Sequence, residues 1–231
     1  MSLQYAKESI VLGALKDIEE NQKHLQEINL QSSVVWKGKS CVMMTKLAES
    51  MLKNTKLTAI NLVDCSINDE GLKSLTGTLA NNATLFHLNL SKNKIGRPAL
   101  LDLGAALATN TGLMSLELTG IRVDSNVCAC FMETFNKNLT LLKLIWDPEV
   151  RSYNLKFTEM LNRNGEIDRA VHDGKPFDKL VPLGLTPPDL KPRVVPDPDE
   201  DESRQMVARE DGAETLQRNW PKPFGSWGEE K

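Results

Sequence analysis

The side chains that most often perform acid–base or metal chemistry are few in this sequence. Its three histidines are His24, His87 and His172. No two of them stand at the spacing of a metal-binding pair, so the sequence predicts no metal site. His87 is expected on a strand, where a surface or contact histidine is far more common than a catalytic one.

The cysteines are the remaining candidates for nucleophilic or redox chemistry, and they are Cys41, Cys65, Cys128 and Cys130. Cys128 and Cys130 are two residues apart on an expected helix, where they face different sides, so we interpret them as packing residues. The N-terminal segment has only a short apolar run with acidic residues close behind, which argues against a secretory signal. We therefore expect free thiols and a cytoplasmic location, with the cytoskeleton or a cilium as the more specific alternatives.

Other signatures of function are also missing from the sequence. It contains no phosphate-binding glycine loop, nucleophile elbow or zinc-protease motif, so we predict no catalytic residue, no cofactor and no enzymatic activity. The net charge is −3 and the basic residues are dispersed, which gives no support for nucleic-acid binding. No apolar run approaches the roughly 20 residues that span a bilayer, so no membrane partner is expected.

What the sequence does contain is a repeat. Four segments begin with Asn and reach Leu three residues later, and these asparagines are Asn54, Asn82, Asn110 and Asn138. Each starts 28 residues after the one before. An internal period of this length is typical of solenoid proteins, in which one unit cannot bury its apolar face alone.

Each repeat predicts a strand followed by a helix. The segment Leu85-x-x-Leu88-x-Leu90-x-x-Asn93-x-Ile95 shares its template with the segments that begin at Leu57 and Leu113, and an earlier copy begins at Leu25. The alternating part is a short strand with one buried face. Leucines three and four residues apart then indicate a helix, and these are Leu72, Leu75 and Leu79 in one unit and Leu100, Leu103 and Leu107 in the next.

Single residues make the prediction more specific. Asn68 or Asp69 can cap one helix, and Pro98 suits the first turn of another. Asn93 is expected to bond backbone groups at the inner bend of its unit. The four repeated asparagines suit helix C-termini in the left-handed conformation. The first unit carries about four extra residues, which we place around 36–39.

These features predict an α/β fold, a short right-handed solenoid of about five strand–helix units with a curved parallel sheet. The 28-residue period resembles the ribonuclease-inhibitor-like class of leucine-rich repeats. Residues 25–170 resemble the leucine-rich-repeat domain of tropomodulins and leiomodins, with 25–30 and 46–55 similar to its opening unit and 138–144 and 161–169 to its closing unit. That resemblance implies binding to actin filaments.

Three parts of the chain are expected. Residues 1–24 form an N-terminal capping helix whose apolar stripe includes Ile10, Val11 and Ile18, with a partner-binding helix as the alternative. Residues 25–175 form the leucine-rich-repeat domain. Residues 176–231 form a proline-rich, acidic, extended tail.

Two surfaces are predicted to bind proteins. The outward strand positions form two rows on the concave face, which are Glu27, Ala59, His87, Ser115 and Lys143, and Asn29, Asn61, Asn89, Glu117 and Ile145. The candidate contact residues among them are His87, Asn89, Ser115, Glu117 and Lys143. In the tail, Trp220, Phe224 and Trp227 are predicted to anchor in pockets of a partner.

The sequence thus favours a non-enzymatic protein-interaction scaffold. We interpret it as a structural or adaptor subunit of a larger assembly, cytoskeletal or axonemal, whose partners are other protein subunits of that complex. One alternative is a tropomodulin-like protein that binds actin or another cytoskeletal protein. The other is a regulator of an enzyme that acts by one-to-one binding.

Overall fold

A computed structural model describes residues 3–4, 6–150, 152–185, 190 and 192 of the chain. The chain divides into two compact units, Met1–Leu190 and Lys191–Lys231. The second unit lies almost wholly outside the described residues, and the account below concerns the first.

One parallel sheet runs through the first unit. Its five strands pair in sequence order, and they are β1 (Glu27–Asn29), β2 (Ala59–Asn61), β3 (His87–Asn89), β4 (Ser115–Glu117) and β5 (Lys143–Ile145). The register aligns equivalent repeat positions, so that Ile28, Ile60, Leu88, Leu116 and Leu144 are successive partners. Both the parallel sheet and the alternation of strand and helix confirm the predicted fold class.

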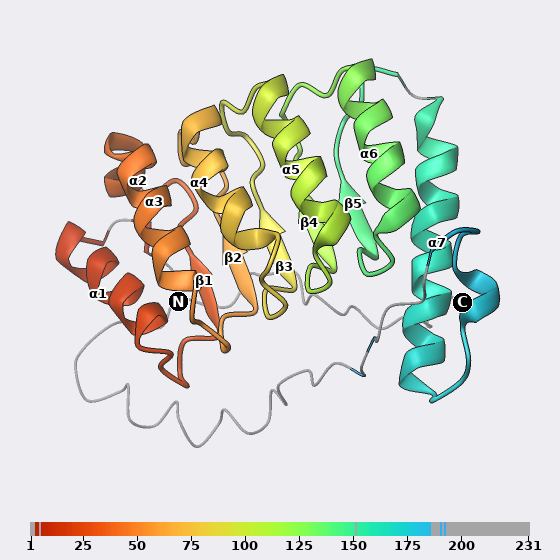
Figure 1. Cartoon of the computed structure of the whole chain (residues 1–231). Coiled ribbons are helices and arrows are strands. Elements are labelled where there is room, and N and C mark those ends of the chain that lie inside the picture. The colour runs from red at the N-terminus through yellow and green to blue at the C-terminus, as the bar shows by residue number, and fades with distance from the viewer. Residues whose placement is uncertain (1–2, 5, 151, 186–189, 191, 193–231) are drawn as a thin grey trace, which may run out of the picture. The chain divides into compact units, whose positions relative to one another are not determined.

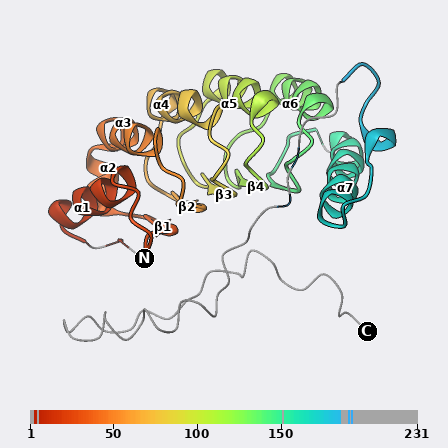
Figure 2. The same cartoon turned by 60° about the horizontal axis from the view of Figure 1, so that its bottom comes forward.

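The helices all lie on one side of this sheet. They are α1 (Glu8–Glu19), α2 (Val34–Gly38), α3 (Ser40–Met51), α4 (Asp69–Leu79), α5 (Arg97–Thr109), α6 (Ser125–Lys137) and α7 (Tyr153–His172), with the short 3-10 helix η1 (Asp178–Leu180) after them. Figure 1 views the helices in front of the strands. Figure 2 shows them along the outside of an arc with the strands along the inside, so the sheet presents a concave face.

The core lies between the sheet and the helices. The inward strand residues and the helix leucines are 0–2% exposed in the central repeats, as their spacing predicted. Burial of each such side chain contributes about 1.5–3 kcal/mol. Neighbouring helices pack on each other in chain order, α3 on α4, α4 on α5 and α5 on α6, so each repeat is stabilised mainly by the next one.

The extra residues of the first repeat form a helical turn of their own. They fold as α2, immediately before α3, and place Trp36 in the core with 0% of its surface exposed. Ser33 caps this helix, because its hydroxyl accepts a hydrogen bond from the Trp36 backbone N–H. The insertion therefore fills the first repeat with a large aromatic side chain.

The N-terminal end of the solenoid is covered. Helix α1 packs on α3 and buries Val11 and Ile18 completely. Leu3 is also buried, and its N–H donates to the Asn29 carbonyl at the outer edge of β1. Ile10 differs from the predicted stripe, because 46% of its surface is exposed.

An aromatic cluster closes the C-terminal end. Trp146 lies 5.2 Å from Phe131 and 4.8 Å from Phe157, measured between ring centroids. Phe157 also meets Phe135 edge to face at 5.6 Å. Because Phe157 comes from α7 and Phe131 and Phe135 from α6, these rings join the last helix to the last complete repeat.

The repeated asparagines form a ladder that links one repeat to the next. The Asn138 side-chain amide donates to the carbonyls of Leu107 and Asn110 in the preceding repeat, at 2.7 and 3.0 Å. Its side-chain oxygen accepts from the N–H groups of Thr140 and Leu141 in its own repeat. Asn110 makes the same four bonds. Asn54 makes three, because its amide donates only to the Ile18 carbonyl of α1. These side chains satisfy backbone groups that the solenoid buries.

The ladder ends on α7. Asn164 is fully buried and donates to the carbonyls of Asn138 and Leu141. Arg163 donates to the Phe135 and Asn138 carbonyls, which places a cation at the C-terminus of α6, where the helix dipole favours it. The last helix thus replaces the asparagine of a further repeat.

The left-handed conformation predicted for the repeated asparagines is wrong. Asn110 and Asn138 have extended backbones, with φ of −69° and −76°. None of the four repeated asparagines has a positive φ. A positive φ recurs instead at one equivalent position in the turn after each of four strands, at Ser32, Asp64, Lys92 and Gly120. The hydrogen bonds of the side chain, and not the backbone conformation, therefore explain the asparagines at 110 and 138.

Other local predictions are confirmed. Asn68 caps α4 by accepting from the Gly71 N–H, and Pro98 lies in the first turn of α5. Asn93 accepts from the N–H groups of Cys65 and Ile67 and donates to three carbonyls, including that of Leu62. Asp69 accepts a hydrogen bond from the Gly96 N–H of the next repeat.

We predict that Asn138→Ala lowers the free energy of unfolding by about 3 kcal/mol, because it leaves buried backbone N–H and C=O groups without partners. Asn136→Ala is the matched control, since Asn136 is exposed in the last turn of α6, two residues before Asn138, and it should change stability by no more than about 0.5 kcal/mol. Urea unfolding measures both. Equal effects would show that the ladder adds nothing to stability.

A pair of glycine substitutions tests the turn conformation. Gly120→Ala should destabilise by about 1 kcal/mol, because residue 120 has a φ of +74°. Gly77→Ala should stabilise by about 1 kcal/mol, because Gly77 is exposed in α4 with nothing within 4 Å of an added Cβ. Thermal and urea unfolding should show opposite signs, and a common sign would contradict this assignment.

Candidate functional site

The concave sheet face carries the two predicted rows. Strand register places Glu27, Ala59, His87, Ser115 and Lys143 side by side, and beside them Asn29, Asn61, Asn89, Glu117 and Ile145. The five candidate contact residues therefore lie together over β3, β4 and β5. Whether they bind a protein stays a prediction, but their placement on one face is what a docking surface needs.

The asparagine row has a structural role that the sequence did not reveal. The side-chain oxygens of Asn29, Asn61 and Asn89 each accept from the backbone N–H two residues later, at 3.0, 3.1 and 3.0 Å. Each side chain thereby closes the turn that leaves its strand. The amide of Asn89 also donates to Glu117 at 2.6 Å, which holds that carboxylate against the sheet.

His87 occupies the centre of the other row. Burial lowers the pKa of its imidazole from 6.5 to about 4, with a further contribution from the positive charge of Lys143. The imidazole is therefore neutral at pH 7. Lys143 is exposed, and no salt bridge to its ammonium group forms within the described part of the chain.

A row of apolar residues at the start of three strands was missed in the sequence. Phe86, Met114 and Leu142 precede β3, β4 and β5 at equivalent repeat positions, where Met114 is buried and Phe86 and Leu142 are partly exposed. Backbone bonds from the Met114 N–H to the Phe86 carbonyl and from the Leu142 N–H to the Met114 carbonyl place them in adjacent strands. We name these three residues the apolar row. The 28-residue alignment contained the signal, because three successive apolar residues fill a position that is Gln26 and Thr58 in earlier units.

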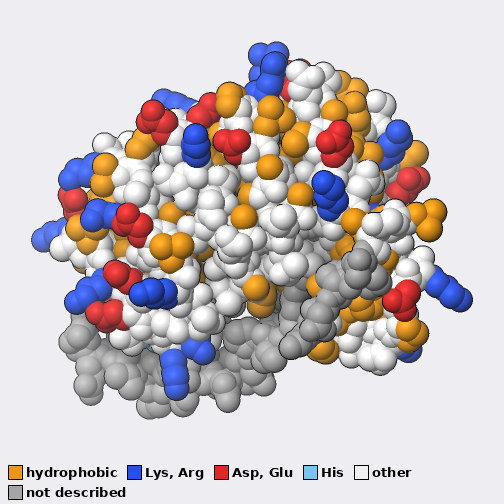
Figure 3. All heavy atoms as spheres, viewed as in Figure 1, with side chains coloured by type: hydrophobic (Ala, Val, Ile, Leu, Met, Phe, Trp, Pro, Cys, Tyr) orange, Lys and Arg blue, Asp and Glu red, His pale blue; other side chains and the backbone are white. Residues whose placement is uncertain are grey.

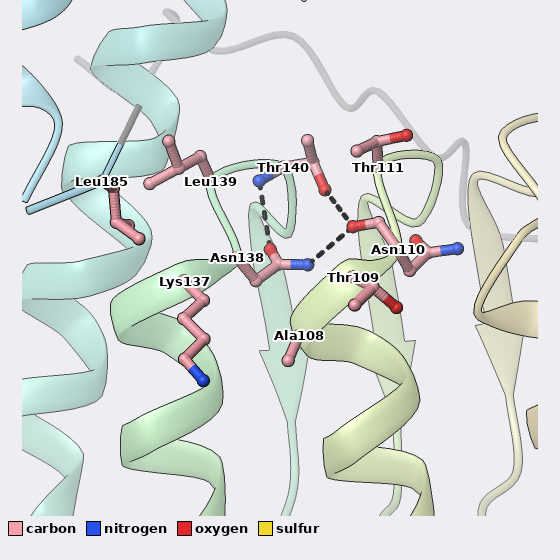
Figure 4. A pocket seen from close by; sticks show the side chains of 9 residues that line it. All are labelled: Ala108, Thr109, Asn110, Thr111, Lys137, Asn138, Leu139, Thr140 and Leu185. Atoms are coloured by element: carbon pink, nitrogen blue, oxygen red, sulfur yellow. Dashed lines mark hydrogen bonds between the residues drawn. The ribbon is translucent and has the colours of Figure 1, made fainter. Parts of the chain in front are cut away.

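A pocket of about 200 Å³ lies at the edge of the solenoid where the strands begin, between the loops that lead into β4 and β5. Figure 4 shows its lining, with Asn138 bonded to the backbone of Asn110 and Thr140. Leu139 and Leu185 add an apolar wall, and Lys137 a cation. Because its asparagines are already engaged in the ladder, the pocket offers few polar groups to a ligand.

Ion pairs connect neighbouring repeats at the edge of the solenoid where the strands end. Lys37 contacts Asp64, Arg97 contacts Asp124, and Arg122 contacts Glu149, each at 2.6 Å. All three pairs join residues 27 apart, so each connects neighbouring units. Exposed pairs of this kind contribute about 0–1 kcal/mol, so we assign them to alignment of the repeats and not to a binding site.

The helix face shows no comparable concentration of one residue type. In Figure 3, acidic and basic side chains of this face alternate with apolar ones over the helices. Mixed charges are usual on the solvated surface of a solenoid. The concave face, with its aligned rows, is the more specific surface.

The cysteines lie where packing requires them. Cys65 and Cys128 are fully buried, and burial raises the pKa of the Cys65 thiol to about 12. The Cys65 Sγ donates to the Leu30 carbonyl at 3.0 Å. Burial also raises the pKa of Cys128 and Cys130, which disfavours the reactive thiolate form.

The described residues lack the features of two other classes of site. They contain no group of three or more His, Cys, Asp or Glu side chains that could hold a metal ion. None of the helices in the described ranges is both long and apolar enough to cross a membrane. The predicted tail anchors Trp220, Phe224 and Trp227 lie outside the described residues, so their role remains a prediction.

Comparison with known families agrees with this architecture. The family model described as the TMOD/LMOD leucine-rich domain matches residues 10–167. The chain belongs to the TMOD/LMOD leucine-rich domain family. The match includes most of α1, all five strands and most of α7, so the TMOD/LMOD domain accounts for the whole repeat region. A search of curated proteins found no match to the sequence.

Two solved structures of TMOD/LMOD domains share the fold. Leiomodin-1 actin-binding site 2 aligns with a TM-score of 0.63 and 23% identity, over 71% of this chain and 94% of that one. The C-terminal domain of tropomodulin from Caenorhabditis elegans aligns with a TM-score of 0.64 and 20% identity, over 71% and 99%. At this identity the likeness establishes the TMOD/LMOD fold and assigns no partner.

We predict a loss of stability in acid that depends on His87. Its pKa is about 4 in the folded chain and 6.5 in the unfolded chain, so the unfolded chain binds the proton more readily. The contribution of the neutral His87 side chain to the free energy of unfolding is at its full value above pH 6.5 and is lost as the pH falls toward 4. Unfolding of the His87→Asn variant between pH 7 and 4 should show a smaller decrease than the native chain. Parallel decreases would contradict the depressed pKa.

Proposed function

We propose that this chain is a non-catalytic protein-interaction module whose concave sheet face receives a protein partner, as a structural or adaptor subunit of a larger assembly. One observation carries the proposal. Five parallel strands in a single register align polar side chains of modest size into continuous rows across one open face. Such a face gives a partner many weak contacts and no reactive group, which suits recognition.

Actin is the second candidate, as a specific partner. The chain belongs to the TMOD/LMOD family, and one solved structure with this fold is titled as an actin-binding site of leiomodin-1. This supports actin, or another cytoskeletal protein, as the first partner to test. A cytoskeletal location follows from the same proposal.

The partner can be identified from the native assembly. Gentle purification of the tagged full chain, followed by sizing and identification of co-eluting proteins, should give a large stable complex. Recovery of a small one-to-one complex with an enzyme would instead favour a regulatory role. Recovery of the bare monomer would contradict the role of a structural subunit.

We predict saturable binding of the full chain to actin filaments in co-sedimentation. His87→Arg should weaken it at least about tenfold, because it places a larger, charged side chain at the centre of the face. His172→Arg is the control, since the same substitution at an exposed position in the last turn of α7 leaves the face unchanged. Absence of sedimentation would remove actin as the partner, and equal binding by both variants would exclude the concave face.

A further inference from the structure

Residues 3–4, which precede α1, lie against the first repeat. The Leu3 side chain is buried to 1% exposure and belongs to the core cluster. Its N–H donates to the Asn29 carbonyl at 2.7 Å, and the Gln4 carbonyl accepts from the Val34 N–H at 3.3 Å. These residues therefore contact β1 through one hydrogen bond, α2 through another and the core through a leucine, as a bound peptide would.

The edge of β1 that Leu3 contacts is the outer edge of the sheet. The Gln26 carbonyl and the Leu30 N–H both bond to the second repeat. Because the backbone groups of a strand alternate in direction, the Asn29 carbonyl points to the other side, away from β2. An outer edge of this kind is a template for pairing with another segment of chain. In this structure residues 3–4 occupy it at the Asn29 position.

Few interactions hold these two residues. Among the described residues, Leu3 and Gln4 form no further hydrogen bond to the repeats, and the bond from the Ala6 N–H to the Leu3 carbonyl stays within the segment. Trp36 of α2 is fully buried, yet its indole N–H has no hydrogen-bond partner in the described part of the chain. The polar groups at this end of the core are thus less completely paired than those of the asparagine ladder.

Covalent connection favours such a contact. A segment tethered beside its site has an effective concentration in the millimolar range, so one leucine and two backbone bonds suffice to keep it bound. The same contacts made by a separate peptide carry the full cost of association and are weak. A separate peptide should therefore bind only when the intramolecular segment has been withdrawn.

We propose that the outer edge of the first repeat is a peptide-binding site that the chain fills with its own residues 3–4. The site takes a leucine side chain into the core, an N–H onto the Asn29 carbonyl and a carbonyl onto the Val34 N–H. A second copy of the chain carries the same segment and supplies it in trans when the intramolecular segment is withdrawn. This site lies at the β1 end of the solenoid, so the proposal is independent of the function proposed for the concave face (Figure 2).

Withdrawal of the intramolecular segment tests the proposal on the full chain. Leu3→Ser removes the buried apolar side chain and should leave the site open. The probe is a peptide with the sequence of residues 1–7, titrated into isotope-labelled protein and followed by NMR. The native chain should not respond, whereas the Leu3→Ser chain should bind saturably, with shifts at Asn29 and Val34. A peptide with serine in place of its leucine should bind at least about tenfold more weakly, because it buries no apolar side chain.

A substitution at Val34 tests the second hydrogen bond. In the Leu3→Ser chain, Val34→Pro removes the N–H and should weaken peptide binding about fivefold, while Val34→Ala keeps the N–H and should leave it unchanged. Proline suits this position, because Val34 is the first residue of α2 and Ser33 before it has a ψ of 123°.

Three outcomes would overturn the proposal. Far-ultraviolet circular dichroism and thermal unfolding first establish that each variant is folded. Equal binding of the leucine and serine peptides would exclude a specific leucine site. Absence of binding to the folded Leu3→Ser chain would show that the edge accepts no separate peptide. Equally tight binding to the native chain would show that residues 3–4 do not occupy the site.

Discussion

The repeat junction depends on one interaction, the side-chain amide of an asparagine that bonds to the backbone of two successive units. A parallel solenoid buries the loops that lead into its strands, and those loops contain N–H and C=O groups that the sheet cannot pair. Asn110 and Asn138 satisfy these groups in both directions, toward the preceding carbonyls and toward their own N–H groups. No other side chain combines two donors and an acceptor in so short a reach.

This constraint also decides how the solenoid ends. Without a further asparagine at the last junction, the carbonyls of Asn138 and Phe135 would be buried without donors. Arg163 and Asn164 of α7 supply those donors, and the aromatic contacts of Phe157 hold the helix in place.

A rigid register has a functional consequence. Because the ladder and the inter-repeat ion pairs fix each unit against the next, side chains on the concave face stand in rows with constant spacing. Rows of this kind recognise shape and spacing more than any single chemical group, which suits a protein partner. Membership of the TMOD/LMOD family places the chain among leucine-rich domains. Side chains such as His87 and Lys143, which differ from repeat to repeat, give this concave face its own surface.

The sequence by itself determined the repeat, the alternation of strand and helix, and the residues of the two polar rows, because a 28-residue period encodes which side chains face inward. It also identified features that depend on only a few neighbouring residues, such as the helix cap at Asn68 and the proline in the first turn of α5. The tertiary structure alone decided what the asparagines do. Their partners lie about 30 residues away, so local reasoning assigned them to backbone conformation and missed the ladder. The pKa of His87 likewise arises only when distant strands meet, because burial is a property of the stacked repeats.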